Sequence, residues 1–142
     1  MEDEIFHKMF ELDEMHWWFY GQRAWLRQFY SRFRKQNKKW LDVGCGVGDI
    51  LRTLKKDFIV FGIDKNDLAV AYSKKRGISN LVKGEALALP FKDESFDFVS
   101  VLGIIYHRGV KDELSCLKES LRVCKREGIL FFLEPEIGRA HV

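Results

Sequence analysis

A chain of 142 residues with 46% hydrophobic residues has room for one domain around a single apolar core, which argues against intrinsic disorder. No apolar run approaches the roughly 20 residues that a membrane-spanning helix needs, and the acidic first residues are unlike a secretion signal, so we expect a soluble cytoplasmic protein. The formal net charge of +3 is small, and three cysteines without a C-x-x-C spacing argue against a disulfide framework and against a metal site.

Residues 1–38 differ in pattern from the rest of the chain. Their apolar residues recur at helical spacing and are interrupted at Gly21, which predicts a helical cap over 1–38 made of two helices. Arginine and lysine dominate positions 23–39, with aromatic residues between them. Such a stretch can touch nucleic acid or an anionic membrane surface, or it can be the solvated face of an amphipathic helix. We favour the amphipathic helix and expect no nucleic-acid partner.

From Trp40 onward, short apolar runs alternate with amphipathic stretches, a pattern typical of βαβ units and a parallel sheet. We expect the core of the domain over 39–136. The predicted strands lie at 40–43, 58–63, 81–82, 96–102 and 129–133. After the first strand comes a glycine-rich turn and then a helix, which we expect Asp49 to cap while Ile50, Leu51 and Leu54 face inward.

Two further helices are predicted between the later strands. Asn66 or Asp67 can cap the first of them, and Gly77 ends it. Its residues expected to face the sheet are Leu68, Ala71 and Tyr72. The second begins at 112–113, where acidic residues suit the helix dipole, and is expected to end at Gly128. It carries one apolar stripe, formed by Leu114, Leu117 and Leu121.

The glycine-rich turn is the first candidate functional site. Glycine at every second position of 44–48 lets a ligand lie against the backbone, and the helix that follows favours a carboxylate or a phosphate; alternatively, the glycines only form a tight turn. Asp64 ends the next strand about 20 residues later, where a doubly wound fold brings an acid to ribose hydroxyls, although it can also be a helix cap. The spacing is G-x-G-x-G preceded by Asp42, whereas the dinucleotide fingerprint is G-x-G-x-x-G.

Five motifs follow one another along the chain: LDVGCGVG at 41–48, GID at 62–64, GEA at 84–86 with LPF at 89–91, SFDFV at 95–99, and LRV at 121–123 with GIL at 128–130. In this order they resemble the class I S-adenosylmethionine-dependent methyltransferases, in particular the small-molecule group called type 11. The resemblance implies a Rossmann-like α/β fold with three αβα layers and a mostly parallel sheet. It also implies methyl transfer from S-adenosylmethionine to a small-molecule acceptor.

The resemblance also implies which residues contact the cofactor. The methionine end would be held by Asp42, Gly44, Cys45, Gly46 and Gly48, and the ribose hydroxyls by Asp64. Glu85 and Ala86 would lie beside the adenine, where the family usually has Asp-Ala, so the side chain at position 85 is one methylene longer here. Lys65 and Leu102 complete the implied contacts. The segment 125–128 reads KREG where the family typically has KPGG, a departure that we regard as structural.

The acceptor side is less defined. The motif HWWF-x-G-x-R at 16–23 resembles one found in many bacterial members of the group, which implies that His16, Trp17, Tyr20 and Arg23 line the site; alternatively, these aromatic residues pack the cap on the core. His107 follows the fourth strand and is the candidate general base or acceptor-orienting group, or else a structural histidine. No metal is expected.

The family fold continues beyond the fifth strand, so we expect this chain to lack strands 6 and 7 and to be a fragment. Residues 137–142 match the translation of a common sequencing adapter, and we interpret them as a non-native tail. Two other functions remain open. A nicotinamide-dependent oxidoreductase shares the glycine turn and the distant acid, and a non-catalytic cofactor-binding module shares every feature of the site.

Overall fold

A computed structural model describes residues 37–102 and 113–133, with six isolated positions before them: Asp3, Glu4, His7, Ala24, Gln28 and Arg32. Almost all of the predicted cap (1–38) and all of 137–142 lie outside the described residues. The elements are β1 (Lys39–Val43), α3 (Asp49–Leu54), β2 (Ile59–Asp64), α4 (Asp67–Lys75), β3 (Leu81–Lys83), β4 (Phe96–Leu102), α5 (Glu113–Val123) and β5 (Cys124–Leu133).

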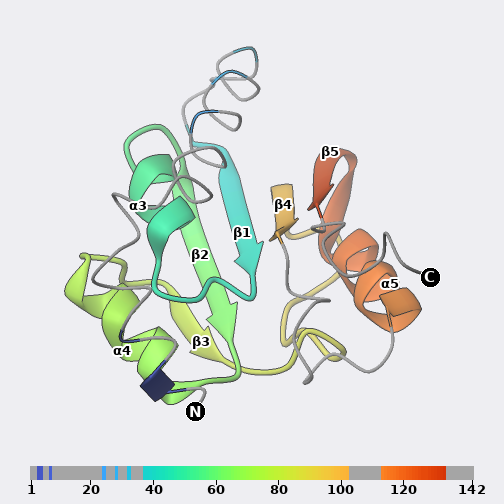
Figure 1. The fold of residues 1–142 in the computed structure, drawn as a ribbon. Coiled ribbons are helices and arrows are strands. Elements are labelled where there is room, and N and C mark those ends of the chain that lie inside the picture. Colours follow the sequence, from blue (N-terminus) through green and yellow to red (C-terminus); the bar gives the residue numbers. More distant parts are fainter. Residues whose placement is uncertain are drawn as a thin grey trace, which may run out of the picture.

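The strands form one sheet in the order β3-β2-β1-β4-β5, and every neighbouring pair is parallel (Figure 1). This arrangement confirms the predicted α/β fold with a parallel sheet. The chain order of the strands reverses at β1, which lies between β2 and β4. In open α/β sheets, ligands bind outside the carboxyl ends of the strands at such a point, so the turn after β1 is in the expected place.

Alternating residues of the strands build two separate apolar cores, one on each face of the sheet. Trp40 belongs to the core that α3 covers, where Leu51 and Leu54 are fully buried. Leu41 belongs to the opposite core, to which α5 contributes Cys116. Strands that are buried on both faces are nearly continuous apolar runs. Residues 40–43 of β1 and 96–102 of β4 fit this pattern except at three polar positions, Asp42, Asp97 and Ser100.

The start of α3 differs from the prediction. Gly48 occupies the N-cap position in the left-handed conformation, with φ 82°, and no side chain caps the helix, so Asp49 is the first helical residue and not the cap. The predicted inward face is confirmed, because Ile50, Leu51 and Leu54 are buried. A glycine that already turns the chain into the helix removes the need for a capping side chain.

Helix α4 is capped as predicted, because the Asn66 side chain accepts hydrogen bonds from the amides of Leu68 and Ala69. The predicted inward face was partly wrong: Ala71 is exposed, whereas Ala69 and Ser73 are fully buried. The hydroxyl of Ser73 is hydrogen-bonded to a backbone carbonyl, so this polar side chain can be buried without penalty.

Helix α5 ends earlier than predicted, at Val123 and not at Gly128, and β5 begins at the next residue. The helix ends where the amides of Glu94 and Ser95 donate hydrogen bonds to the carbonyls of Arg122 and Val123. Its predicted apolar stripe is largely exposed, with Leu114 at 58% and Leu121 at 55%. The residues buried against the sheet are Cys116, Ser120 and Val123.

The register of β5 against β4 contains an irregularity. Phe96 is paired with Cys124 and Phe98 with Ile129, so residues 125–128 bulge out of the ladder. Within the part of the chain that the structure describes, no helix has the length and apolarity required to cross a bilayer.

Candidate functional site

The turn between β1 and α3 has a backbone shape that its glycines make accessible. Gly44, Gly46 and Gly48 all have positive φ values, 72°, 55° and 82°. This left-handed region is unfavourable for residues with a Cβ atom. Alternate left-handed residues explain why the sequence has glycine at every second position of the turn.

Hydrogen bonds within the protein fix the conformation of this turn. The amides of Gly44 and Cys45 both donate to the carbonyl of Ile63, at 2.8 and 3.0 Å, and the amide of Gly48 donates to the carbonyl of Cys45 at 3.1 Å. The Ser73 hydroxyl of α4 donates to the carbonyl of Gly46 at 3.0 Å. Contacts from β2 and α4 therefore hold the turn in place without any bound ligand.

Asp64, the last residue of β2, joins the turn to the start of α4. One carboxylate oxygen accepts the Gly46 amide and the other accepts the Asn66 amide, both at 2.9 Å. A carboxylate has about four acceptor positions, so two backbone bonds leave capacity for two hydroxyl donors of a ligand. Asp64 thus has a structural role in the turn and is available to a sugar.

Asp42 lies near the end of β1 that leads into the glycine turn, and it is almost completely buried. It is paired in register with Ser100 of β4, whose hydroxyl donates to the carboxylate at 2.7 Å. Ser100 in turn accepts a hydrogen bond from the indole Nε1 of Trp40 at 2.9 Å. Burial raises the pKa of Asp42 from 3.8 to about 7, against the lowering effect of the Ser100 hydrogen bond, and the negative charges of Asp64 and Asp49 add to the rise.

Two carboxylates, Asp49 and Asp64, act on Asp42 beside the glycine turn, and within the described residues the charges that act on Asp42 are both negative. Burial is the largest cause that raises the pKa of the Cys45 thiol, and the charges of Asp42 and Asp64 raise it further. Arg52 is near Asp49, at 3.9 Å. Within residues 37–102 and 113–133, no group of three His, Cys, Asp or Glu side chains could hold a metal ion. The carboxylates of Asp42, Asp49 and Asp64 suit an organic cation beside the turn.

The other predicted cofactor contacts lie at the same edge of the sheet. Lys65 follows β2 directly, and Leu102 is the last residue of β4. The amide of Gly84 donates to the carbonyl of Asp64 at 3.0 Å, which places the segment with the exposed Glu85 and the buried Ala86 beside the end of β2. The contacts of these residues with a cofactor stay predictions.

The predicted acceptor-side residues lie outside the described residues. They are His16, Trp17, Tyr20, Arg23 and His107. One contact of the N-terminal segment is described: His7 is hydrogen-bonded to the Tyr72 hydroxyl of α4, with ring centroids 5.4 Å apart. Tyr72 also packs against the cluster of Val47 and Ala69 beside the glycine turn, so the contact places His7 near the candidate site.

Sequence reasoning missed three residues that support the turn. Ser100 and Trp40 hold Asp42, and Ser73 holds the carbonyl of Gly46. One signal was available for Ser100, a single hydroxyl within the apolar strand FDFVSVL, because a polar side chain in a buried strand needs a hydrogen-bond partner.

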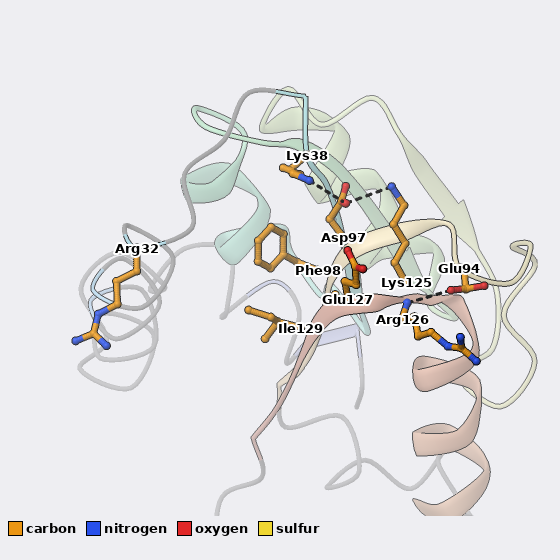
Figure 2. A pocket seen from close by; sticks show the side chains of 10 residues that line it. Arg32, Lys38, Glu94, Asp97, Phe98, Lys125, Arg126, Glu127 and Ile129 are labelled. Carbon is orange, nitrogen blue, oxygen red and sulfur yellow. Dashed lines mark hydrogen bonds and ion pairs between the residues drawn. The ribbon is translucent and has the colours of Figure 1, made fainter.

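A cavity lies at the opposite end of the sheet. Its volume is about 780 Å³, and it lies between Lys38, the start of β4 and the bulge at 125–128 (Figure 2). Asp97 stands in it between Lys38 and Lys125, at 3.5 and 3.2 Å. Because the strands are parallel, this cavity opens at their amino ends, far from the glycine turn and its carboxylates, and we give it no role in the site.

Comparisons with known proteins point to one family. A family model described as a methyltransferase domain matches residues 41–132. Demethylmenaquinone methyltransferase of Geobacillus stearothermophilus is 34% identical over 152 residues, which cover 94% of this chain and 64% of that enzyme. The chain thus spans less than two thirds of the length of this relative.

Solved structures agree on the fold. A putative S-adenosylmethionine-dependent methyltransferase from Methanococcus maripaludis matches 92% of this chain and 62% of its own, with a TM-score of 0.79 at 18% identity. A methyltransferase from Thermotoga maritima, described as a possible histamine N-methyltransferase, matches 91% of this chain and 56% of its own, with a TM-score of 0.68 at 26% identity.

Proposed function

The chain belongs to the class I S-adenosylmethionine-dependent methyltransferase family, and from this premise we propose that its glycine turn binds S-adenosylmethionine for methyl transfer to a small-molecule acceptor. The observation that carries the proposal is the cluster of Asp42, Asp49 and Asp64 around a turn of left-handed glycines. S-adenosylmethionine carries a sulfonium and an ammonium group, and both are cations that these carboxylates attract.

The same features argue against a nicotinamide dinucleotide. A pyrophosphate needs free backbone amides and is repelled by carboxylates. In this turn the backbone amides already donate to acceptors within the protein. Those of Gly44 and Cys45 donate to the Ile63 carbonyl, that of Gly46 donates to the Asp64 carboxylate, and that of Gly48 donates to the Cys45 carbonyl. Among the predicted alternatives, the oxidoreductase therefore has less support from the site than the methyltransferase.

Each residue of the site has a role in the proposal. Asp64 accepts the ribose hydroxyls with the acceptor positions that its two backbone bonds leave open, and Asp42 faces the methionine end as a negative charge. The left-handed glycines keep side chains out of the space between them. When bound, the cofactor supplies an activated methyl group, whose bond to sulfur breaks as the acceptor bonds the carbon, and S-adenosylhomocysteine remains. The protein thus contributes mainly binding and orientation.

For the acceptor, we take the relatives as a guide. The Geobacillus stearothermophilus relative is a demethylmenaquinone methyltransferase, so a quinone of this kind is the first acceptor to test. The residues predicted to line the acceptor site and to act as general base, including His16 and His107, lie outside the described residues. Their roles stay predictions.

Calorimetric titration with S-adenosylhomocysteine and with NAD tests the proposal. We expect the former to bind and the latter not to bind. Asp64→Asn should weaken binding about 10- to 100-fold, because hydrogen bonds to a charged group contribute roughly 1.5–3 kcal/mol. The matched control is Asp67→Asn, since Asp67 lies three residues later, is exposed and pairs with Lys83 on the surface.

Binding of NAD in preference to S-adenosylhomocysteine would contradict the proposal. Methyl transfer from labelled S-adenosylmethionine to demethylmenaquinone then tests the acceptor. Cofactor binding without transfer to any acceptor in a broad panel would favour the non-catalytic module instead.

A further inference from the structure

Two consecutive hydrogen bonds connect the aromatic core of the protein with Asp42. The indole of Trp40 stacks on Phe98 and Phe131, with centroids 4.9 and 5.0 Å away, so its position is fixed. Its Nε1 is 2.9 Å from the Ser100 hydroxyl, which is 2.7 Å from the Asp42 carboxylate. Trp40 and Ser100 are completely buried and Asp42 is 3% exposed, so water does not compete for these bonds.

The direction of both bonds is determined by chemistry. An indole N–H only donates, so the Ser100 oxygen accepts from Trp40. The single proton of the hydroxyl is then free to point at Asp42, and an ionised carboxylate only accepts. Trp40 therefore orients and polarises the hydroxyl in the way that favours the ionised form of Asp42.

The other surroundings of Asp42 favour its neutral form. Burial is the largest cause that raises its pKa, and Asp64 of β2 and Asp49 of α3 raise it further. The buried Cys45 thiol of the turn has a raised pKa and carries no charge near neutrality. Against these, the hydrogen bond from Ser100 lowers the pKa of Asp42, and the balance leaves it at about 7.

We propose that Trp40 and Ser100 form a pair of hydrogen bonds that sets the pH range in which Asp42 is ionised, and through this the pH range in which the site holds the ammonium group of its cofactor's methionine end. Both are positioning residues, because they act through Asp42. The inference rests on the proposed function and adds a regulatory property to it. Below neutral pH, binding requires that Asp42 lose its proton to the solvent as the ligand ammonium group takes its place beside the carboxylate.

The test is the pH dependence of S-adenosylhomocysteine binding to the 142-residue chain, measured by calorimetry between about pH 5.5 and 8.5. In the wild type, affinity should rise about tenfold per pH unit below a midpoint near neutrality and then level off, since one proton is released. Titrations in buffers with different ionisation enthalpies should show this proton release directly below the midpoint.

Ser100→Ala removes the donor to the carboxylate. Its midpoint should move upward by about one to two pH units, as expected for a hydrogen bond to a charged group. At pH 8.5 the affinity of this variant should still rise with pH, whereas that of the wild type has levelled off. Trp40→Phe keeps an aromatic ring in the core but loses the N–H and part of the indole volume, so it should also be less stable, and its midpoint should move in the same direction by less. Ser100→Cys, with a weaker donor, should lie between the wild type and Ser100→Ala.

Ser120→Ala is the matched control. Ser120 is also completely buried, but its hydroxyl donates to the Cys116 carbonyl in α5, away from Asp42. This variant should lose stability in a thermal melt and keep the wild-type binding midpoint. A structural effect of losing any buried hydroxyl is thereby separated from an effect on Asp42.

Two results distinguish the failure of the proposed role of Trp40 and Ser100 from the failure of the function. Their role is overturned, while the proposed function stands, if the wild type binds tightly at every pH. The same holds if Ser100→Ala and Trp40→Phe leave the binding midpoint unchanged. A wild type that does not bind S-adenosylhomocysteine at any pH overturns the proposed function and the role of Trp40 and Ser100 with it.

Discussion

Two aspartates at opposite ends of the sheet have opposite environments. Asp42, at the carboxyl end of β1, is surrounded by burial and by other carboxylates, which raise its pKa to about 7. Asp97, at the amino end of β4, accepts bonds from the Lys39 amide and from Lys125 and lies 3.5 Å from Lys38. Although burial acts to raise the pKa of Asp97, these bonds and charges keep it below its usual value.

The difference indicates what each end is for. At the amino end, the negative charge of Asp97 is balanced by lysines of the protein itself. Its hydrogen bonds with Lys39 and Lys125 connect β4 with β1 and with the bulge at 125–128. Among the described residues, the charge of Asp42 has no such balance, which costs stability in the free protein. An unbalanced buried carboxylate is retained when a ligand of opposite charge completes it. The following predictions test this contrast, from the largest expected effect to the smallest.

Asp42→Asn should stabilise the free protein at pH 8. The folded form holds the Asp42 proton up to about pH 7 and the unfolded form only to about 3.8, so the wild type loses stability as the pH rises between these values. The difference corresponds to as much as roughly 4 kcal/mol, which the variant regains at pH 8 and not at pH 4. Urea unfolding at both pH values measures this. If Asp42→Asn is less stable than the wild type at pH 8, the contrast between Asp42 and Asp97 is wrong.

Gly48→Ala should lower the free energy of unfolding by about 3 kcal/mol, from left-handed strain and from overlap. Its Cβ atom would stand 2.9 Å from the Ser73 hydroxyl oxygen and 3.1 Å from the Ser73 Cα. Gly77→Ala is the matched control, because φ is +81° there and the near atom is only the flexible end of Lys55. We expect about 1 kcal/mol for the control. Equal losses would show that the turn is not closely packed.

Arg122→Lys tests the amino end, where charges are paired. Arg122 donates to the carbonyls of Leu89 and Phe91 and to the carboxylates of Glu119 and Asp93. Lysine cannot make all these bonds from one position, so we expect a loss of about 2 kcal/mol at pH 7. The hydrogen bond from Arg122 is the largest cause that lowers the pKa of Glu119, so the loss should shrink as the pH falls through the lowered value. Thermal melts at pH 7 and pH 3 measure it.

Asp97→Asn should have the smallest effect, a loss of about 1 kcal/mol at pH 7, because its partners Lys38 and Lys125 are 39% and 47% exposed. The pKa of Asp97 is lowered, so its contribution is present above the usual value of 3.8 and disappears as the pH falls below it. Asp42→Asn and Asp97→Asn should therefore change stability at pH 7 in opposite directions. Chemical unfolding of the two variants side by side decides this.

The parts of the site that depend on local chemistry could be predicted from the sequence. Left-handed residues at 44, 46 and 48 require glycine, so the pattern itself predicts the turn. Asp64 ends an apolar run, and Asn66 lies where a helix must be capped. The family motifs added the identity of the cofactor, which neither composition nor helical spacing contains.

The parts that depend on distant contacts could not be predicted. Ser100 is 58 residues from Asp42 and 60 from Trp40, so no local pattern connects them. The inward face of α5 was also not predictable, because the leucines that make it amphipathic are exposed at positions 114 and 121. Ser120 is buried against the sheet instead, and its hydroxyl donates to the Cys116 carbonyl within the same helix.

The hydrogen bonds that hold the glycine turn have a kinetic consequence. Ile63, Asp64 and Ser73 fix its backbone before any ligand arrives, so association does not require a loop to become ordered. Encounter should then proceed at a rate set by diffusion and electrostatic steering, and variants of the turn should alter the residence time of the ligand more than its rate of arrival.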